Sequence, residues 1–213
     1  VYRSHPGVEV MHRTLRDGTH GRPLQLVVFC GQNFPFYRPA YASTYYAKRE
    51  SGGGAVQDAL THLFNAAQWL IGHFDSVVAD AAHQALPNVE VEDTAHVLAR
   101  HGGLLATYAM NQYQAPNEIS ICVVCEQGTL KLELHNQRLL MQKDPGASWT
   151  VLGEYPLERD EWFIRQANQF MDVVAGDAKP LCPLSEGIHT LRVNLAVLRS
   201  LETRRWETVS DQL

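Results

Sequence analysis

The chain has 213 residues, of which 45% are hydrophobic, and this is enough apolar side chain for a sizeable core. Eighteen lysines and arginines against 23 aspartates and glutamates give a formal net charge of -5, which offers no general attraction to nucleic acid or to an anionic membrane. No apolar run approaches the roughly 20 residues of a membrane span, and the first residues lack the long apolar core of a signal peptide. We therefore expect a soluble, cytoplasmic protein with neither nucleic acid nor membrane as a partner.

The four cysteines are too few and too scattered for a disulfide framework, which fits a reducing compartment. Cys122 and Cys125 spell C-x-x-C, but they lie in ISICVVCE, a strand pattern. A spacing of three places the two sulfurs on opposite faces of a strand. This geometry disfavours a zinc or redox role for the pair.

The first fifty residues predict a helix, a strand and an aromatic segment. Val8 to Arg16 has helical apolar spacing and closes at Asp17-Gly18, and Leu24 to Cys30 is rich in β-formers. Residues 31–50 then hold six Phe and Tyr side chains among prolines. These aromatic side chains either pack over the core or line a pocket.

A long central helix is predicted from Ala55 to Ile71. Three glycines, Gly52 to Gly54, allow a tight entry, and Gly72 provides a C-terminal stop. At about 100° per residue, one broad apolar face of the helix must be buried. That face is formed by Val56, Leu60, Leu63, Ala67 and Leu70.

The opposite face of this helix carries a narrow polar stripe. Asp58, His62 and Asn65 follow one another at spacings of four and three, with Trp69 one turn further on. A fully exposed face usually carries Lys, Glu or Arg, and the helix contains none of these residues. The stripe is therefore expected to face another part of the protein or a ligand, although an ordinary surface pair of Asp58 and His62 is the simpler alternative.

Several strands are predicted after the helix, and turn signals at Gly102-Gly103 and Gln127-Gly128 join them into a meandering antiparallel sheet. The expected strands are Ser76 to Ala82, Asp93 to His101, Leu104 to Gln112, Glu118 to Glu126, Thr129 to Leu134 and Leu139 to Lys143, with a candidate edge at Trp149 to Val151. If helices cover one face of this sheet, Val97, Leu104 and Ile121 on the other face could form a dimerisation surface.

Two helices are expected to close the chain, from Asp160 to Ala175 and from Ser185 to about Thr203, with WETVS as a final strand. There is no internal repeat, low-complexity tract or convincing linker. The fold class predicted from these elements is α+β, a predominantly antiparallel open sheet with helices packed on one face.

An ordered series of segments resembles the C-terminal part of the Gfo/Idh/MocA oxidoreductases. The segments are Tyr37-Arg38-Pro39, GGGAVQDALTH, WLIG, EDTAHVLARHGG, and WFIRQANQFMDVVAGDAKP with the last helix. Enzymes of that family join an N-terminal Rossmann domain to a C-terminal domain that builds most of the substrate pocket and usually the subunit interface. The resemblance implies an NAD- or NADP-dependent dehydrogenase of a sugar, polyol or related hydroxyl compound, assembled as a homodimer or homotetramer through the sheet.

The nucleotide-binding half of such an enzyme is not found in these 213 residues. There is no G-x-G-x-x-G after a strand and no E-K-P with the lysine that the family uses. Residues 1–6 resemble the last strand or linker from a Rossmann domain, and residues 7–213 the C-terminal substrate-binding and oligomerisation domain. We expect no tight dinucleotide binding and no activity from this chain alone.

The resemblance also implies roles for the polar stripe. Asp58 and His62 fall on the family's D-x-x-x-H pair, whose histidine is usually the acid/base at the substrate hydroxyl or carbonyl. An imidazole that titrates near neutrality suits that step, and a carboxylate one turn back can orient it. Asn65 stands where many relatives have Asp, so only a polar contact with substrate is expected of it.

Further substrate contacts are implied just before the glycine turn. Lys48 occupies a position where the family often presents a substrate-contacting side chain, and Tyr45, Tyr46 and Arg49 lie beside it in the sequence. A solvated basic turn is the alternative interpretation of this segment.

Two other functions stay open at this point. Asp58 and His62 could both ligate zinc in a metal-dependent hydrolase if a third ligand came from the aromatic segment or the sheet. The domain could also be a non-enzymatic sugar-binding or assembly module.

Overall fold

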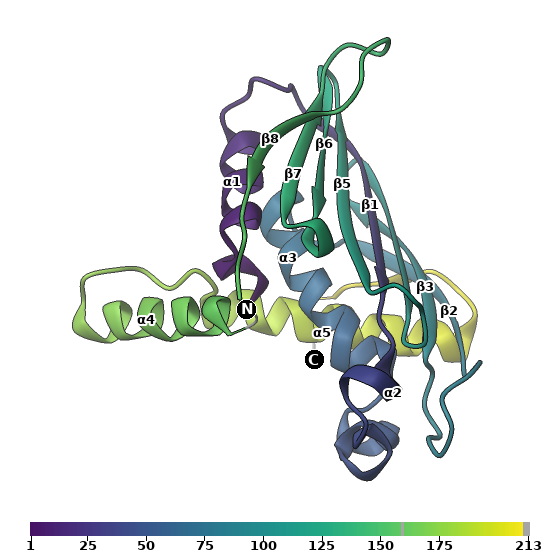
Figure 1. The fold of residues 1–213 in the computed structure, drawn as a ribbon. Coiled ribbons are helices and arrows are strands. Elements are labelled where there is room, and N and C mark those ends of the chain that lie inside the picture. Colours follow the sequence, from purple (N-terminus) through teal and green to yellow (C-terminus); the bar gives the residue numbers. More distant parts are fainter. Residues whose placement is uncertain (159, 211–213) are drawn as a thin grey trace.

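The computed structural model describes residues 1–158 and 160–210, and within them nine strands form one open sheet (Figure 1). The strands are β1 (Pro23–Gly31), β2 (Ser76–Ala82), β3 (Thr94–His101), β4 (Leu104–Asn111), β5 (Glu118–Cys125), β6 (Gly128–Glu133), β7 (Arg138–Gln142), β8 (Thr150–Glu154) and β9 (Glu207–Thr208). Their order across the sheet is β8-β7-β6-β5-β1-β4-β3-β2-β9. Every strand predicted from Leu24 onwards is present, including the two short edges β8 and β9.

The helices also follow the predicted order. They are α1 (Pro6–Arg16), α2 (Phe34–Tyr37), the π-helical η5 (Ala55–Leu60), α3 (Thr61–Ile71), α4 (Glu161–Ala175) and α5 (Leu184–Thr203). Two short 3-10 turns matter for the site, η1 (Tyr2–Ser4) and η3 (Tyr45–Ala47). Residues 2–4 therefore turn into α1 and do not form a strand. Within residues 1–158 and 160–210, no helix is long and apolar enough to cross a membrane.

One pair of strands departs from the predicted meander. β1 lies between β4 and β5, antiparallel to β5 but parallel to β4, with Gln25 opposite Leu105 and Gly31 opposite Asn111. The other neighbouring strands in the sheet are antiparallel. The fold class is thus the α+β class that we expected, with one parallel pairing that a local sequence pattern does not reveal.

Helices α1, α3 and α5 lie against one face of the sheet (Figure 1), and the core fills the space between them. The proposed dimerisation residues Val97, Leu104 and Ile121 are at most 6% exposed and belong to this core. Their assignment to the open face was wrong, because alternation along a strand separates two faces without showing which one the helices cover. The open face instead presents Val27, Leu98 and Leu105, which are 38% to 50% exposed.

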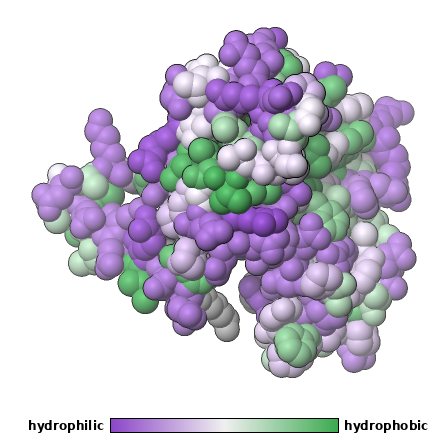
Figure 2. Space-filling view, turned by 45° about the horizontal axis from the view of Figure 1, so that its top comes forward, coloured by the Kyte–Doolittle hydropathy of each residue, from purple (hydrophilic) through white to green (hydrophobic). Residues whose placement is uncertain are grey.

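Helix α4 differs from the other long helices because it has no buried residue. It projects away from the sheet in Figure 1, and Figure 2 shows hydrophobic atoms at the surface on the side where it projects. Large apolar side chains on it are 50% to 65% exposed. They are Phe163, Ile164, Phe170, Met171 and Val174.

The aromatic segment does both of the things proposed for it. Phe34, Tyr41 and Tyr46 form a small second core with Leu86, Val89 and Val91. Rings of the same segment also line a hollow that is described below.

Candidate functional site

The first residues of the helix that carries the polar stripe donate hydrogen bonds to the buried residue Glu92. Ala55 N donates to the backbone oxygen of Glu92 at 2.9 Å, and Val56 N donates to Glu92 Oε1 at 3.1 Å. The Glu92 side chain is only 4% exposed. Because the first N–H groups of a helix lack partners within the helix, these bonds fix where it starts. Its first six residues are π-helical, a local geometry that is frequent at functional sites.

Arg49 contributes to the same anchor. Its Nη2 lies 3.2 Å from Glu92 Oε2. This predicted substrate contact therefore has a protein partner, and it holds the start of η5 rather than reaching towards His62. The charge of Arg49 balances the buried carboxylate, which would otherwise be costly to keep in the interior.

Asp58 lies one turn before His62 on η5, and its side chain is 6% exposed. The Tyr45 hydroxyl donates to Asp58 Oδ1, and Arg38 Nη1 lies 3.8 Å from Oδ2. Among the described residues, no hydrogen bond joins Asp58 to His62. The carboxylate acts on the imidazole through its charge, because both of its oxygens have other partners.

His62 is the exposed member of the pair. Its ring lies 6.3 Å from the Tyr2 ring, measured between centroids, so it is covered on one side by the N-terminal turn η1. This partial burial lowers the pKa of His62 below its ordinary value of 6.5, and the charge of Asp58 opposes the shift. The neutral imidazole is thus favoured at neutral pH.

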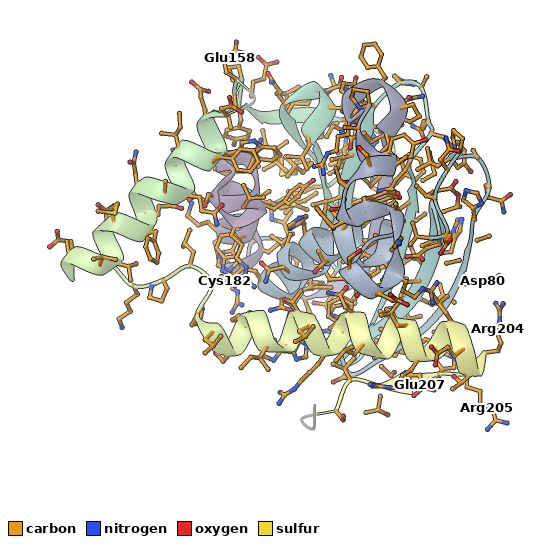
Figure 3. The ribbon with its side chains drawn as sticks, turned by 90° about the horizontal axis from the view of Figure 1, so that it is seen from below. Asp80, Glu158, Cys182, Arg204, Arg205 and Glu207 are labelled. Atoms are coloured by element: carbon orange, nitrogen blue, oxygen red, sulfur yellow. The ribbon has the colours of Figure 1, made fainter. Side chains whose placement is uncertain are left out.

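The His62 pocket is a hollow of about 380 Å³ beside α3. Its walls come from the N-terminal residues, α3, α4 and the segment that enters α5, and Cys182 marks that segment in Figure 3. Thr61, His62 and Asn65 line it from α3, and Gln169 lines it from α4. Of the predicted polar stripe, His62 and Asn65 therefore face a hollow large enough for a small polar ligand, whereas Asp58 does not line it.

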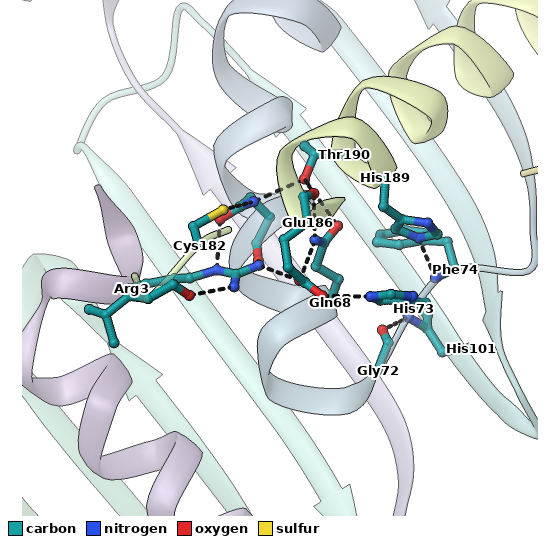
Figure 4. A network of polar contacts seen from close by, with 12 residues as sticks. Arg3, Gln68, Gly72, His73, Phe74, His101, Cys182, Glu186, His189 and Thr190 are labelled. Carbon is teal, nitrogen blue, oxygen red and sulfur yellow. Dashed lines mark hydrogen bonds and ion pairs between the residues drawn. The ribbon is translucent and has the colours of Figure 1, made fainter. Parts of the chain in front are cut away.

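Asn65 also has protein partners. Its amide Nδ2 donates to Thr190 Oγ1 at 2.9 Å and approaches Cys182 Sγ at 3.4 Å, while its Oδ1 accepts from Arg3. Figure 4 shows this region, in which Arg3 connects α3 to Glu186 on α5. Asn65 thus holds the wall of the His62 pocket together.

The Arg38 pocket is a second, smaller hollow of about 220 Å³. It is lined by Phe34, Arg38, Pro39, Ala40, Tyr41, Thr44, Tyr45 and Tyr46. Tyr46, a predicted substrate contact, is 2% exposed and donates its hydroxyl to Gln112 Oε1, so only its ring faces the hollow.

Lys48 follows η3 at the surface. Its backbone oxygen accepts from Gly53 N at 3.0 Å, whereas its side chain is exposed and has no hydrogen bond or ion pair within the described part of the chain. A ligand could therefore use its ammonium group without breaking a contact within the protein.

Residues 8–131 match the family described as the GFO/IDH/MocA C-terminal domain. The chain belongs to the Gfo/Idh/MocA family. No curated protein matches it.

Solved structures show the same fold over almost the whole chain. A levoglucosan dehydrogenase in complex with NADH and levoglucosan has a TM-score of 0.86, with 18% identity over 99% of this chain and 65% of that one. An NAD binding oxidoreductase from Klebsiella pneumoniae has a TM-score of 0.87, with 19% identity over 99% and 65%. The WlbA dehydrogenase from Bordetella pertussis, in complex with NADH and UDP-GlcNAcA, has a TM-score of 0.78, with 20% identity over 97% and 62%. The chain thus spans less than two thirds of the length of these structures.

The zinc alternative lacks a third ligand in this Gfo/Idh/MocA domain. Across residues 1–158 and 160–210, no three His, Cys, Asp or Glu side chains lie close enough together to hold a metal ion. Asp58 is engaged by Tyr45 and Arg38 instead.

The sequence patterns did not identify three residues that shape this Gfo/Idh/MocA site: Arg3, Arg38 and Glu92. Arg38 and Glu92 lie in segments that carry the family resemblance, Tyr-Arg-Pro and EDTAHVL, so their position was a usable signal. Arg3 gave no such signal, because its partners lie on α3 and α5, far away in the sequence.

Proposed function

We propose that this chain is the substrate-binding and catalytic C-terminal domain of an NAD(P)-dependent oxidoreductase that acts on a sugar, a polyol or a related hydroxyl compound. The observation that carries this proposal is the position of His62, whose imidazole borders the His62 pocket on a helix anchored by Glu92. An acid/base group must lie within reach of the reacting hydroxyl, and the wall of a hollow provides such a place. Membership of the Gfo/Idh/MocA family supports the same class of reaction.

In this proposal His62 takes the proton of the substrate hydroxyl during oxidation and returns it during reduction. Its lowered pKa keeps the imidazole neutral and able to accept a proton near pH 7. The nearby negative charge of Asp58 stabilises the imidazolium that forms, and Tyr45 and Arg38 hold that carboxylate in place. The nicotinamide supplies the hydride acceptor when the cofactor is bound.

No residue of this chain is assigned to hold the nucleotide part of the cofactor, because the 213 residues contain no glycine-rich dinucleotide fingerprint. We infer that a Rossmann domain outside residues 7–213 binds NAD or NADP and that residues 1–6 form the link to it. The exposed apolar side chains of α4 support a surface that another domain covers. Alone, the chain is expected to be inactive.

The substrate class rests on the neighbours and on the polar groups near the site. The solved relatives are described as complexes with levoglucosan, with L-sorbose and with UDP-GlcNAcA. Lys48 is the predicted contact best placed to reach a ligand, since its side chain is exposed, and the exposed ring of Tyr45 lines the Arg38 pocket while its hydroxyl is bound to Asp58. Tyr46 and Asn65 contribute by shaping the walls of the two pockets, and Arg49 contributes by holding Glu92 at the start of η5.

We also propose that the open face of the sheet pairs with a second copy to form a homodimer or homotetramer in the cytoplasm. Val27, Leu98 and Leu105 give this face an apolar centre, and edge-to-edge growth is limited by the very short β9.

Replacement of His62 in the complete enzyme tests the catalytic role. His62→Ala is expected to lower kcat by about 10²-fold or more, with a smaller change in KM. The matched control is His135→Ala, because His135 is also exposed but lies in the short turn after β6 and lines neither pocket. Unchanged turnover of His62→Ala on a substrate that the wild type oxidises would contradict the role of His62 and would favour a binding or assembly module.

A further inference from the structure

The Arg38 pocket has an unusual set of polar groups for its size. Arg38 is the one charged residue among the residues that line it. Its other polar side chains are hydroxyls, and the protein already uses each of them. Tyr41 donates to the backbone oxygen of Pro87, Tyr46 to Gln112, Thr44 to the backbone oxygen of Tyr41, and Tyr45 to Asp58.

Arg38 is the exception because most of its donors are free for a ligand. A guanidinium carries five N–H groups, and the ion pair with Asp58 is held by one nitrogen at 3.8 Å, which is longer than a hydrogen bond. The side chain is 58% exposed. Its carbon Cζ lies 5.2 Å from the centre of the Phe34 ring, so the guanidinium makes a cation–π contact with that ring.

We propose that the Arg38 pocket is a subsite for the negatively charged group of a sugar derivative, with Arg38 as the specificity-determining residue. The ligand group is a carboxylate or a phosphate, the two anions that a planar guanidinium binds through paired hydrogen bonds. Aromatic side chains form most of the remaining wall and accept the apolar C–H face of a sugar ring. A neutral sugar gains less here, because its bonds to Arg38 have only one charged partner and the hydroxyls of the pocket have no free donor to offer it.

The subsite is connected to His62 through Asp58. Tyr45 lines the Arg38 pocket and donates to Asp58, which lies one helical turn from His62. The charge of Arg38 also lowers the pKa of His62, so the subsite lies close enough to affect the proposed acid/base group. This inference rests on the proposed function for the identity of the reacting group, but binding at Arg38 is measurable without any reaction.

The test is an amide-resolved NMR titration of the 213-residue chain without cofactor, at constant ionic strength. The probes are D-glucuronate, D-glucose 6-phosphate and D-glucose. One or both anionic probes should bind at least about tenfold more tightly than glucose, because a charge-assisted bond is formed. The shifted amides should include residues 38–46. The two anions distinguish a carboxylate subsite from a phosphate subsite.

Two arginine variants separate this site from general charge attraction. Arg38→Met should abolish the preference for the anionic probe, and Arg38→Lys should restore part of it. Arg22→Met is the matched control, since Arg22 is 69% exposed in an ion pair with Glu126 elsewhere on the surface. The proposal is overturned if glucose binds as tightly as both anions, if Arg38→Met keeps the preference, or if the shifts lie away from residues 38–46. Failure of the His62→Ala test with a retained anion preference would reject the proposed reaction and keep the subsite.

Discussion

Arg3 and Asn65 are joined by two hydrogen bonds, one from Arg3 Nε to Asn65 Oδ1 at 2.8 Å and one from Arg3 Nη2 to Asn65 O at 3.0 Å. The same guanidinium donates to Leu181 O at 2.9 Å and pairs with Glu186 Oε2 at 2.9 Å (Figure 4). Arg3 is thus a buried connection between the N-terminal turn, α3 and α5.

Arg3→Met should lower the free energy of unfolding by about 3 kcal/mol, because it leaves Glu186 partly buried without its main cation. Burial raises the pKa of Glu186, but hydrogen bonds from His73, Arg3 and Gln68 outweigh burial and lower the pKa to about 2. Urea denaturation measures the effect. The exposed pair of Arg22 and Glu126 provides the control, and Arg22→Met should change stability by less than about 1 kcal/mol. Equal effects of the two substitutions would contradict the structural role of Arg3.

Gly53→Ala should destabilise the entrance to η5. A Cβ atom at Gly53 would overlap the backbone oxygen of Tyr46, and a backbone atom cannot move aside as a flexible side chain can. We expect a cost of about 1–3 kcal/mol, as for other overpacked sites, and weaker ligand binding at the His62 pocket. Thermal unfolding compares this variant with Gly103→Ala, where a Cβ atom meets nothing within 4 Å. A melting temperature equal to that of the control would show that the turn relaxes freely.

The pH dependence of oxidation should report His62. Because its pKa is lowered below 6.5, kcat/KM should fall only at pH values below that point, where the imidazole becomes protonated. Asp58 raises the pKa of His62 and Arg38 lowers it. Asp58→Asn should therefore move the fall of kcat/KM at acid pH to a lower pH, and Arg38→Met should move it to a higher pH. Shifts in the same direction for both variants would mean that a group other than His62 controls the fall of kcat/KM at acid pH.

Acid stability should depend on His101. Burial lowers the pKa of His101 to about 4, although a hydrogen bond to Gly72 O acts in the opposite direction. The unfolded chain then binds a proton at a higher pH than the folded chain does. Above about pH 6.5 His101 is neutral in both states and does not reduce the free energy of unfolding. As the pH falls from there towards 4, proton binding by the unfolded chain lowers that free energy.

His101→Gln should flatten this pH dependence, at some cost in stability at pH 7. Denaturation between pH 4 and pH 7 provides the measurement. His96→Gln, at an exposed position of the same strand, should leave the slope unchanged. A wild-type slope in both variants would exclude His101 as its source.

The sequence predicted the elements well because each has a strong local signal. The run from Ala55 to Ile71 has no Gly or Pro inside it and ends at Gly72, and the structure makes it continuous helix. The strand at Ser76–Ala82 was predicted with its observed ends. Local patterns do not show which strands pair when they lie far apart in the sequence. The parallel pairing of β1 with β4 was therefore missed.

The site was predicted in part for the same reason. Periodicity placed Asp58, His62 and Asn65 on one stripe, of which His62 and Asn65 line the His62 pocket and Asp58 does not. It could not show that Tyr45 and Arg38 take both oxygens of Asp58, because these contacts depend on how the aromatic segment folds back over η5. Nor could it separate Lys48, which is free to meet a ligand, from Arg49, which pairs with Glu92.

The position of β1 in the middle of the sheet affects how the chain is made. On a ribosome its apolar run LQLVVFC emerges before its partner strands, because Gln25 pairs only with Leu105 and Val124, which lie much later in the chain. Until then the strand is an unpaired apolar segment, and contacts between such distant residues form slowly. The centre of the sheet therefore closes only after synthesis has passed β5, and truncated chains that end before residue 104 are expected to aggregate rather than fold.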